Sequence, residues 1–451
     1  MESGRPIRMK KRLKGNVRDA ALQLLIDIEE GGSYSNLALN NVIQTYELNE
    51  KDRRLLTQLV YGTLQMRDAL DYRMSPYVRG KLSGWVRQLL RLSVYQLDYL
   101  TRIPDRAVVY EAVEIAKRRG HQGIVRTVNG ILRSYLRSGG APFEAIENPV
   151  ERLATETSHP LWMIEAWVEQ YGFEVAEQIA FANNTVPERT ARINRTQTTD
   201  EEVLEELTDF GYAVEKHPYV DVAILLEEGS FASSFAFREG RLSIQDASSM
   251  LAVDALEVEE HMTVLDLCAA PGGKTTYIAE SMNNTGKVYA HDIHGHKISK
   301  IEEQANRLHL TNIEASELDG VVVKERYEPN TFDRILIDAP CSGLGVIRRK
   351  PEIKYTKAEE DVIALSHLQF KLVKEAIPLL KTGGILVYST CTIDQRENEK
   401  VVERVLSEFP NMKLKKTYAH EQLQLEEEMI QLLPNEWESD GFFIAAFVKQ
   451  E

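Results

Sequence analysis

The sequence predicts an α/β domain with a doubly wound, mostly parallel sheet, preceded by an all-α bundle and a small α+β domain. Three observations predict this order. Apolar residues recur at helical spacing up to residue 138, helix and strand patterns mix over 161–245, and strands alternate with helices from 246 onward. Alternation of that kind is typical of a sheet covered by helices on both faces. The predicted domains are residues 1–145, 160–240 and 241–451.

The first predicted helix shows the pattern of the whole N-terminal part. Its apolar face consists of Val17, Ala20, Ala21, Leu24, Leu25 and Ile28. Two glycines at 31 and 32 end it, and the same spacing recurs over 55–64, 86–97 and 124–135. Strand patterns are lacking here, so we expect a helical bundle.

The middle of the chain begins with a predicted linker. Residues 138–160 hold two glycines and three prolines without sustained periodicity. Residues 161–182 then have the pattern of one amphipathic helix. Strands at 190–196 and 222–226 flank a helix at 200–210. This mixture predicts a small α+β unit.

The C-terminal part contains short apolar runs that predict a sheet. The expected strands are 263–267, 287–291, a short candidate at 313–316, 332–338, 384–390 and a late edge strand at 442–448. Helical stretches, such as 359–380, lie between them. Parallel strands joined through helices are therefore expected.

The composition indicates a protein that stays in a reducing compartment. The chain has 451 residues with only three cysteines, which argues against a disulfide framework. Its start has no apolar stretch typical of a secretory signal, and no apolar run approaches the roughly 20 residues that span a bilayer. We expect a cytoplasmic protein without a membrane segment.

The net charge of −15 hides an asymmetry along the chain. Residues 1–140 hold 24 Lys and Arg against 14 Asp and Glu, whereas the remainder holds 30 against 55. A basic front attached to an acidic body favours contact between the front and a polyanion such as nucleic acid. A solvated basic surface explains the charge alone equally well.

Two cysteines follow predicted neighbouring strands. Cys341 comes just after the strand at 332–338, and Cys391 directly follows the strand at 384–390. Reacting groups gather beyond the carboxyl ends of the strands in an open α/β sheet. Sequential strands usually pair, so the two thiols are expected to face one pocket. Paired thiols there favour covalent chemistry on an electrophilic ring carbon.

A glycine-containing turn predicts a nucleotide-type cofactor. The first strand leads into residues 268–274, whose small residues let the backbone approach a ligand. The spacing of a phosphate-binding loop is missing. Asp292 closes the second strand, where a carboxylate can bind ribose hydroxyls, and Asp319 follows the third, where an adenine can be met. An adenosyl cofactor without a pyrophosphate clamp points to S-adenosyl-L-methionine.

Several motifs resemble those of the RNA cytosine-5 methyltransferases. They are Asp266-Leu-Cys-Ala-Ala-Pro-Gly-Gly-Lys274, Asp338-Ala-Pro-Cys-Ser-Gly343 and Ser389-Thr-Cys391, with the tract Ile244-Gln-Asp-Ala-Ser-Ser249 similar to the segment that precedes the catalytic domain. The helical front resembles the antitermination factor NusB, an RNA-binding bundle. Together these features resemble the bacterial enzymes of this family that act on 16S ribosomal RNA. The resemblance covers nearly the whole chain.

The resemblance implies an enzyme with a Rossmann-like methyltransferase domain and a set of site residues. Cys391 would be the nucleophile, and Cys341 would help to release the product. The cofactor would be bound by Cys268, Ala269, Ala270, Pro271, Gly272, Gly273, Lys274, Asp292, Asp319 and Asp338. The third motif, Ser316-Glu-Leu-Asp319-Gly320, departs from the usual Gly-Asp-Ala, and this departure concerns the assignment of Asp319.

Further expectations concern the substrate and its surroundings. Asp338 precedes Cys341 by three residues, where a carboxyl can hydrogen-bond the N3 and N4 edge of a cytosine. The basic residues 348–350 are expected to hold adjacent phosphates. The implied partner is 16S ribosomal RNA, free or in an early small-subunit particle, and the protein is expected to be a monomer without an obligate protein partner.

Bland interpretations and alternatives stay open beside these expectations. Cys268 is expected to be a packed residue, Lys274 has the alternative of a solvated helix-start lysine, and His291, His294 and His296 are expected to be surface histidines that bind no metal. A DNA cytosine methyltransferase would use Cys341 as the nucleophile instead of Cys391. A non-catalytic RNA-binding or antitermination factor would bind RNA without the cofactor.

Overall fold

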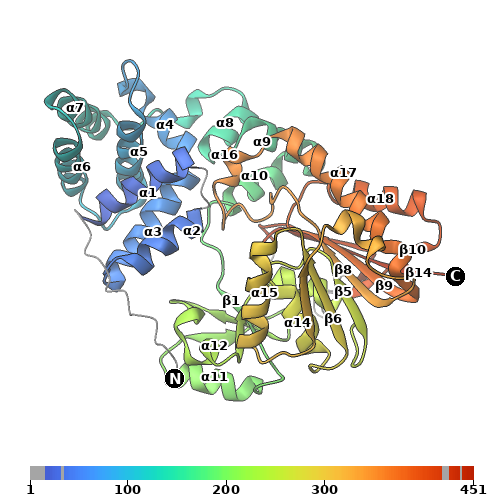
Figure 1. Ribbon diagram of the computed structural model, residues 1–451. Coiled ribbons are helices and arrows are strands. Elements are labelled where there is room, and N and C mark those ends of the chain that lie inside the picture. Colours follow the sequence, from blue (N-terminus) through green and yellow to red (C-terminus); the bar gives the residue numbers. More distant parts are fainter. Residues whose placement is uncertain (1–15, 32–34, 419–425, 437–438) are drawn as a thin grey trace. The chain divides into compact units, whose positions relative to one another are not determined.

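The computed structural model describes residues 16–31, 35–418, 426–436 and 439–451 (Figure 1). By their contacts these residues group into two units. The first contains the described residues up to Thr185 together with Ile347–Thr356, and the second contains Val186–Val346 and the described residues from Lys357 onward. None of the described helices is long and apolar enough to cross a membrane.

The first unit is helical in all of its described elements, as predicted. Its helices are α1 (Val17–Gly31), α2 (Ser35–Thr45), α3 (Glu50–Gln65), α4 (Arg67–Met74), α5 (Gly84–Tyr99), α6 (Asp105–Arg119), α7 (Gln122–Ser138), α8 (Pro149–Glu156), α9 (Leu161–Tyr171), α10 (Phe173–Ala182) and α16 (Ile353–Thr356), with short 3₁₀ turns η1 (Ser75–Tyr77) and η2 (Phe143–Ala145). The apolar faces of α1, α3, α5 and α7 meet in one buried core. The helical periodicity of the sequence therefore determines the interior of this bundle.

Two predictions for the middle of the chain are wrong. The expected linker contains helix α8, because Asn148 caps its first turn by accepting hydrogen bonds from the backbone N–H groups of Val150 and Glu151. Pro149 occupies the first helical position, where its missing N–H costs nothing. The single helix expected over 161–182 is two helices, because Gly172 adopts φ +81° between them.

The segment Ile347–Thr356 is held in the first unit by a buried lysine. Lys354 is 1% exposed. Its Nζ donates to the carbonyls of Gln65 and Thr157, both at 3.0 Å, and to the Asn184 side-chain oxygen at 2.7 Å. Burial lowers the pKa of Lys354 well below its usual value. Three acceptors thus offset the removal of this amine from water.

Further contacts fix both sides of the same segment. The Tyr355 hydroxyl donates to the Leu64 carbonyl at 2.9 Å, and the Arg67 guanidinium lies 3.4 Å above the Tyr355 ring. Arg348, expected among the phosphate-binding residues, is only 3% exposed. That expectation is wrong for Arg348, because packing of the segment buries its side chain.

The second unit begins with a small antiparallel sheet. Its strands are β1 (Thr190–Ile193), β2 (Val214–Lys216), β3 (Ala223–Leu226) and β4 (Leu242–Ile244), in the order β2-β3-β1-β4, with helices α11 (Asp200–Asp209) and α12 (Phe235–Arg238) and the 3₁₀ turn η3 (Phe231–Ser233). The expected α+β unit is present. The sequence does not reveal β2 and β4, because three residues are too few to show an alternating pattern.

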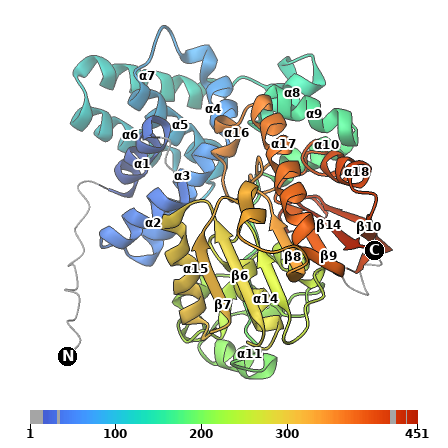
Figure 2. The same cartoon turned by 45° about the vertical axis from the view of Figure 1, so that its right-hand side comes forward.

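A large, mostly parallel sheet follows. Its strands are β5 (Thr263–Asp266), β6 (Lys287–Asp292), β7 (Ile313–Glu317), β8 (Phe332–Asp338), β9 (Leu380–Thr390), β10 (Met412–Lys415), β13 (Met429–Leu432) and β14 (Phe442–Lys449). The order is β10-β14-β9-β8-β5-β6-β7, with β13 also paired to β14. β11 (Thr417–Tyr418) and β12 (Glu426–Glu427) form a separate two-stranded antiparallel sheet. Figure 2 shows β6, β7, β8 and β9 within this sheet. The predicted strand and helix alternation is confirmed.

The last strand is not the edge strand that we expect from the sequence. β14 pairs with β9 on one side and with β10 and β13 on the other. All residues of Phe442–Phe447 are buried. The run is apolar because its strand is buried inside the sheet.

Helices cover both faces of the large sheet. They are α13 (Ala247–Asp254), α14 (Gly273–Ser281), α15 (Gly295–Arg307), α17 (Glu359–Ala376) and α18 (Glu399–Glu408), with 3₁₀ turns η4 (Gly320–Glu325) and η5 (Ile377–Leu379). Val264 and Leu336 belong to the core that contains α13 and α14, whereas the adjacent Leu265 and Ile335 belong to the core of α17 and α18. The strands are therefore buried on both faces, and ligand access is left to their ends.

The buried lysine gives a test of how the first unit is held together. We expect Lys354→Ala to lower the free energy of unfolding of this unit by about 3 kcal/mol, because a cavity opens and three acceptors lose their donor. Hydrogen exchange of the α3 and α8 amides measures the change. Lys350→Ala, in the same segment but partly exposed, is the control; equal protection in both variants would contradict the assignment.

Candidate active site

Cys341 and Cys391 lie just beyond the carboxyl ends of two neighbouring parallel strands. β8 pairs with β9, and Asp338 lies opposite Ser389 at the end of the pairing. The two sulfur atoms are 3.1 Å apart, and both residues are partly exposed free thiols. The predicted pairing of the strands is confirmed, and it brings the two thiols into contact.

The contact between the thiols disfavours a thiolate at Cys341. Its hydrogen bond with Cys391 raises the pKa of the Cys341 thiol well above the usual value, and burial and the carboxyl groups of Glu397 and Asp338 act in the same direction. A thiol with a raised pKa is mostly protonated at neutral pH. Cys341 is therefore a weak nucleophile while this contact persists, and either sulfur can be the donor in it.

Asp338 is held between a lysine and a serine. Lys274 Nζ lies 2.7 Å from one carboxylate oxygen, and the Ser389 hydroxyl donates to the other at 2.9 Å. The Lys274 side chain is 12% exposed and lies 5.1 Å from the centre of the Phe442 ring. Lys274 is thus not a solvated helix-start lysine, and its ion pair joins the glycine turn to the loop that carries Cys341.

Asp266, at the end of β5, has an unused acceptor. One carboxylate oxygen accepts from the Thr275 hydroxyl at 2.6 Å, while the other, also buried, has no hydrogen-bond partner among the described residues. Burial raises the pKa of Asp266 to about 7. A cationic or N–H-bearing ligand at this strand end would satisfy the oxygen and favour the charged carboxylate.

The turn over residues 268–272 needs glycine at its end. Gly272 adopts φ +104°, and a Cβ there would lie 3.1 Å from the Ile301 Cα in α15. The turn therefore packs directly against the backbone of α15. Cys268 in the same turn is not a reactive thiol, because burial raises its pKa. This agrees with its interpretation as a packed residue.

Asp292 ties the second parallel strand to the glycine turn. Its two carboxylate oxygens accept from the backbone N–H groups of Ala270 at 3.3 Å and His294 at 2.9 Å. Each oxygen has a second lone pair. Asp319 lies after β7, where it caps η4 by accepting from the Val321 N–H at 3.1 Å. Both acids therefore lie at the strand ends where the sequence predicts them.

These acids fit the cofactor that the sequence predicts. Asp266, Asp292 and Asp319 lie at the ends of β5 and β6 and after β7, while the nearby Lys274 is already paired with Asp338. An acidic edge suits hydroxyl, amino and sulfonium groups better than a polyphosphate. S-adenosyl-L-methionine carries hydroxyl, amino and sulfonium groups and no phosphate.

The sequence analysis missed a buried glutamate beside the thiols. Glu397 is fully buried and accepts from the Ser342 N–H at 2.9 Å, from the Ser342 hydroxyl, and from the Gln369 side chain at 2.8 Å. The same Gln369 amide donates to the Pro340 carbonyl at 3.0 Å. The residues on either side of Cys341 are thus both fixed. No sequence signal marks Glu397, since charged residues in loops are usually exposed.

One histidine differs from its prediction. His291 is buried because it lies in β6, opposite Ser316 of β7. Its Nε2 lies 2.7 Å from the Tyr327 hydroxyl. His294 and His296 are exposed, as predicted. Among the described residues no cluster of His, Cys, Asp and Glu has the arrangement of a metal site.

Three family patterns match successive parts of the chain. Residues 253–448 match the family described as 16S rRNA methyltransferase RsmB/F, residues 15–137 match the NusB family, and residues 159–231 match an RsmF/B-like, ferredoxin-like domain.

Similar proteins cover the chain from end to end. A probable ribosomal RNA small subunit methyltransferase B of Bacillus subtilis (strain 168) is 48% identical over 444 residues, which is 97% of this chain and 99% of the relative. A ribosomal RNA small subunit methyltransferase B of Serratia proteamaculans (strain 568) is 34% identical over 441 residues, covering 96% and 99%.

Solved structures share the fold. The crystal structure of PH0851 superposes with a TM-score of 0.83 at 26% identity, covering 97% of this chain and all of that one. A methyltransferase homolog protein from Pyrococcus horikoshii gives a TM-score of 0.60 at 29% identity, covering 67% of this chain and all of that one.

The buried glutamate can be tested without any substrate. In Glu397→Ala, the loop around Cys341 loses two acceptors and the thiol loses a neighbouring carboxyl that raises its pKa. We expect alkylation of Cys341 by iodoacetamide to accelerate, since a fall in pKa raises the thiolate fraction. Mass spectrometry of the Cys341 peptide measures the rate. Glu403→Ala, on the exposed side of α18, should leave the alkylation rate unchanged. An unchanged rate in folded Glu397→Ala would refute the effect of Glu397 on Cys341.

Proposed function

The chain belongs to the RsmB/F family of 16S rRNA methyltransferases, and from this premise we propose that it methylates C5 of a cytosine in 16S ribosomal RNA through a covalent bond between Cys391 and C6. The observation that carries the proposal is the 3.1 Å contact between the Cys341 and Cys391 sulfurs at the ends of β8 and β9. Two thiols in one strand-end site suit a reaction that adds sulfur to a ring and later removes it.

The chemistry of cytosine explains why a nucleophile is needed. C5 of cytosine is too weak a nucleophile to take a methyl group directly. Attack of the Cys391 thiolate on C6 forms a carbon–sulfur bond and makes C5 enamine-like. S-adenosyl-L-methionine supplies an electrophilic methyl group. After C5 gains the methyl group it loses its proton, and elimination of the Cys391 sulfur restores the ring.

The motif Ser389-Thr-Cys391 and the environment of Cys341 together favour Cys391 as the nucleophile. A nucleophilic cysteine must lose its proton, and the environment of Cys341 raises the pKa of that thiol. Cys341 can instead donate a hydrogen bond to the Cys391 sulfur and, once deprotonated, act as a strong base toward the C5 proton. These roles disfavour the DNA methyltransferase arrangement, in which Cys341 would attack.

Asp338 and Lys274 are proposed to hold the base. Asp338 lies three residues before Cys341, and Lys274 and Ser389 fix both of its carboxyl oxygens. A carboxyl in that place can hydrogen-bond the N3 and N4 edge of cytosine and favour charge build-up on the ring during attack at C6. The base must leave any stacked helix to reach this site, which a single-stranded loop permits most cheaply.

The cofactor is proposed to lie along the ends of β5, β6 and β7. The turn Cys268–Lys274 would contact it through backbone groups, Asp292 would bind ribose hydroxyls, and Asp319 would lie near the adenine. The unused oxygen of Asp266 supports this placement, because a ligand N–H group would satisfy it. Asp266 is thus added to the site residues predicted from the sequence.

The remaining features are proposed from the family and the charge of the chain. The basic N-terminal part would bind 16S ribosomal RNA, free or in an early small-subunit particle. A monomer in the cytoplasm without an obligate partner suffices for the reaction. Membership of an enzyme family favours this function over a non-catalytic RNA-binding factor.

Loss of the nucleophile tests the assignment directly. We expect Cys391→Ala to reduce methyl transfer by on the order of 10⁴-fold or more, the scale on which loss of a nucleophile acts in other enzymes. Transfer of a labelled methyl group to 16S ribosomal RNA measures the loss. Calorimetric titration with S-adenosyl-L-methionine should give an unchanged Kd, because Cys391 does not hold the cofactor. An active Cys391→Ala beside an inactive Cys341→Ala would reverse the roles of the two cysteines.

The role of Cys341 in release predicts a trapped intermediate. Cys341→Ser should form the bond between Cys391 and C6 but eliminate it slowly. A serine hydroxyl is a much weaker acid than a thiol, so it is not deprotonated near neutral pH and cannot take the C5 proton. A denaturing gel should then show an RNA-dependent band of reduced mobility. The double variant Cys341→Ser with Cys391→Ala should lack this band. Absence of the band in the single variant would contradict the proposed release role.

A further inference from the structure

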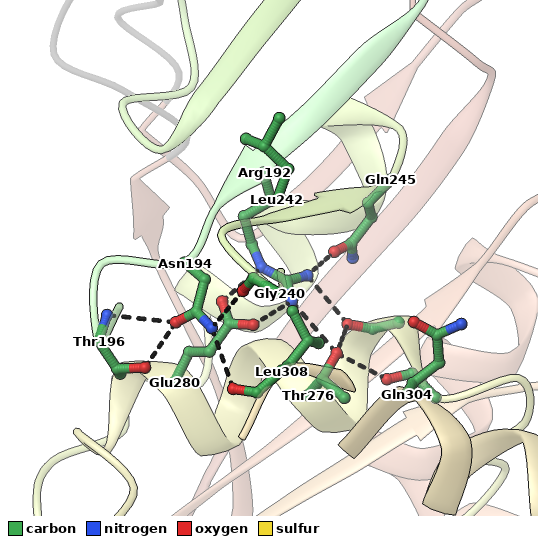
Figure 3. A network of polar contacts seen from close by, with 12 residues as sticks. Arg192, Asn194, Thr196, Gly240, Leu242, Gln245, Thr276, Glu280, Gln304 and Leu308 are labelled. Atoms are coloured by element: carbon green, nitrogen blue, oxygen red, sulfur yellow. Dashed lines mark hydrogen bonds and ion pairs between the residues drawn. The ribbon is translucent and has the colours of Figure 1, made fainter. Parts of the chain in front are cut away.

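Arg192 is a fully buried cation in the small antiparallel sheet. It lies in β1, and its exposed fraction is 0%. Figure 3 shows its guanidinium surrounded by polar side chains of neighbouring elements. A buried charge without partners is costly, so a guanidinium in this position must be matched by several acceptors.

The acceptors come mainly from one face of α14. Glu280 receives two hydrogen bonds from the guanidinium, both at 2.8 Å, and the Thr276 hydroxyl lies 3.1 Å from it. The Gly273 carbonyl accepts at 3.0 Å, and the Gln245 side chain completes the set. Residues spaced three and four apart share a helix face, so one side chain holds α14 along about two turns.

Arg192 holds the glycine turn directly and also through the Thr276 hydroxyl. Arg192 donates directly to the Gly273 carbonyl. It also donates to the Thr276 hydroxyl, which itself donates to the Gly272 carbonyl at 2.9 Å. Each carbonyl shares one planar peptide unit with the N–H group of the following residue. Fixing the carbonyls of Gly272 and Gly273 therefore also fixes the directions of the two N–H groups that follow them.

The small sheet is itself anchored beside this turn. Asn194, two residues along from Arg192, donates to the Leu308 carbonyl at 3.2 Å just beyond α15. In return the Arg307 guanidinium donates to the carbonyls of Phe237 at 2.8 Å and Leu242 at 2.7 Å. Figure 3 shows Asn194 and Leu308 close to the Arg192 cluster. The strand that carries Arg192 is therefore held against both α14 and α15.

We propose that Arg192 is a positioning residue for the methyl donor, which acts from the small sheet by fixing the glycine turn at Gly272 and Gly273 in its binding conformation. The inference rests on the proposed function, because it takes this turn as part of the cofactor site. Arg192 itself lies behind the turn and touches no substrate. The small domain thus contributes to cofactor affinity in addition to any part it plays in binding RNA.

Cofactor titration of a matched pair of variants tests the inference. Arg192→Met keeps an unbranched, flexible side chain, although a shorter one, and removes the donors. We expect the Kd for S-adenosyl-L-methionine to rise about tenfold, the lower end of the cost of losing a supporting residue. The KM for the cofactor should rise with it, while kcat at saturating cofactor stays near the wild-type value. Arg195→Met, which breaks the Arg195 ion pairs with Asp200 and Asp221 away from α14, should leave Kd and KM unchanged. An unchanged Kd in folded Arg192→Met would overturn the inference.

A double variant separates positioning from the bare cost of an unpaired charge. Arg192→Met leaves Glu280 buried without its partner, and that alone can unfold the protein. Arg192→Met with Glu280→Met removes both charges and restores an apolar contact, yet Gly273 and Thr276 still lack their donor. We expect this double variant to fold and to keep the weakened Kd. A wild-type Kd in the double variant would show that Arg192 serves only to neutralise Glu280.

Two further readouts distinguish failure of this inference from failure of the proposed function. Wild-type protein that binds no S-adenosyl-L-methionine would refute the cofactor site itself. Hydrogen exchange without cofactor needs no such site. The amides of residues 272–276 should exchange faster in both variants that lack Arg192 than in wild type or Arg195→Met. Equal exchange in all four proteins would overturn the positioning role even if the cofactor binds.

Discussion

The parallel pairing of β8 with β9 is the constraint on which the candidate active site depends. Because the two strands pair to their carboxyl ends, with Asp338 opposite Ser389, the turns that carry Cys341 and Cys391 begin side by side. Helices cover both faces of the sheet, so the open edge at the strand ends is where a ligand can meet both thiols. A change of register by one residue would point these side chains to opposite faces.

The strands determine roughly where the turns at their ends lie, and buried polar groups fix the conformation of those turns. Glu397 holds Ser342 directly, and through Gln369 it also holds Pro340, while Arg192 holds Gly273. Each is a charged group removed from water, and such a group stabilises a protein little or not at all compared with an apolar replacement. Their hydrogen bonds instead set the directions of backbone groups next to the reacting atoms. Both sets of contacts belong to the second unit; Glu397 acts on the turn after β8, and Arg192 acts on the turn after β5.

Local sequence patterns predict most of the fold. The mistaken predictions have two causes, the local conformation of the backbone and the strands that pair with β14. Apolar periodicity predicts the bundle, the small α+β unit and five parallel strands, because a helix or strand needs one consistent buried face. Gly172 divides a predicted helix, since its positive φ leaves the apolar pattern intact on both sides. β14 is mistaken for an edge strand because an apolar run shows that it is buried without showing which strands enclose it.

The sequence by itself determined which residues stand at the strand ends: the two cysteines, the glycine turn and the acids at 292, 319 and 338. These are visible because each directly follows a run whose periodicity marks a strand. Only the tertiary structure decided that the two sulfurs touch, that Lys274 pairs with Asp338, and that Glu397 and Arg192 hold the turns. The physical reason is that apolar burial repeats along the chain, whereas a buried charge finds its partners across distances of 28 to 88 residues that no local pattern encodes.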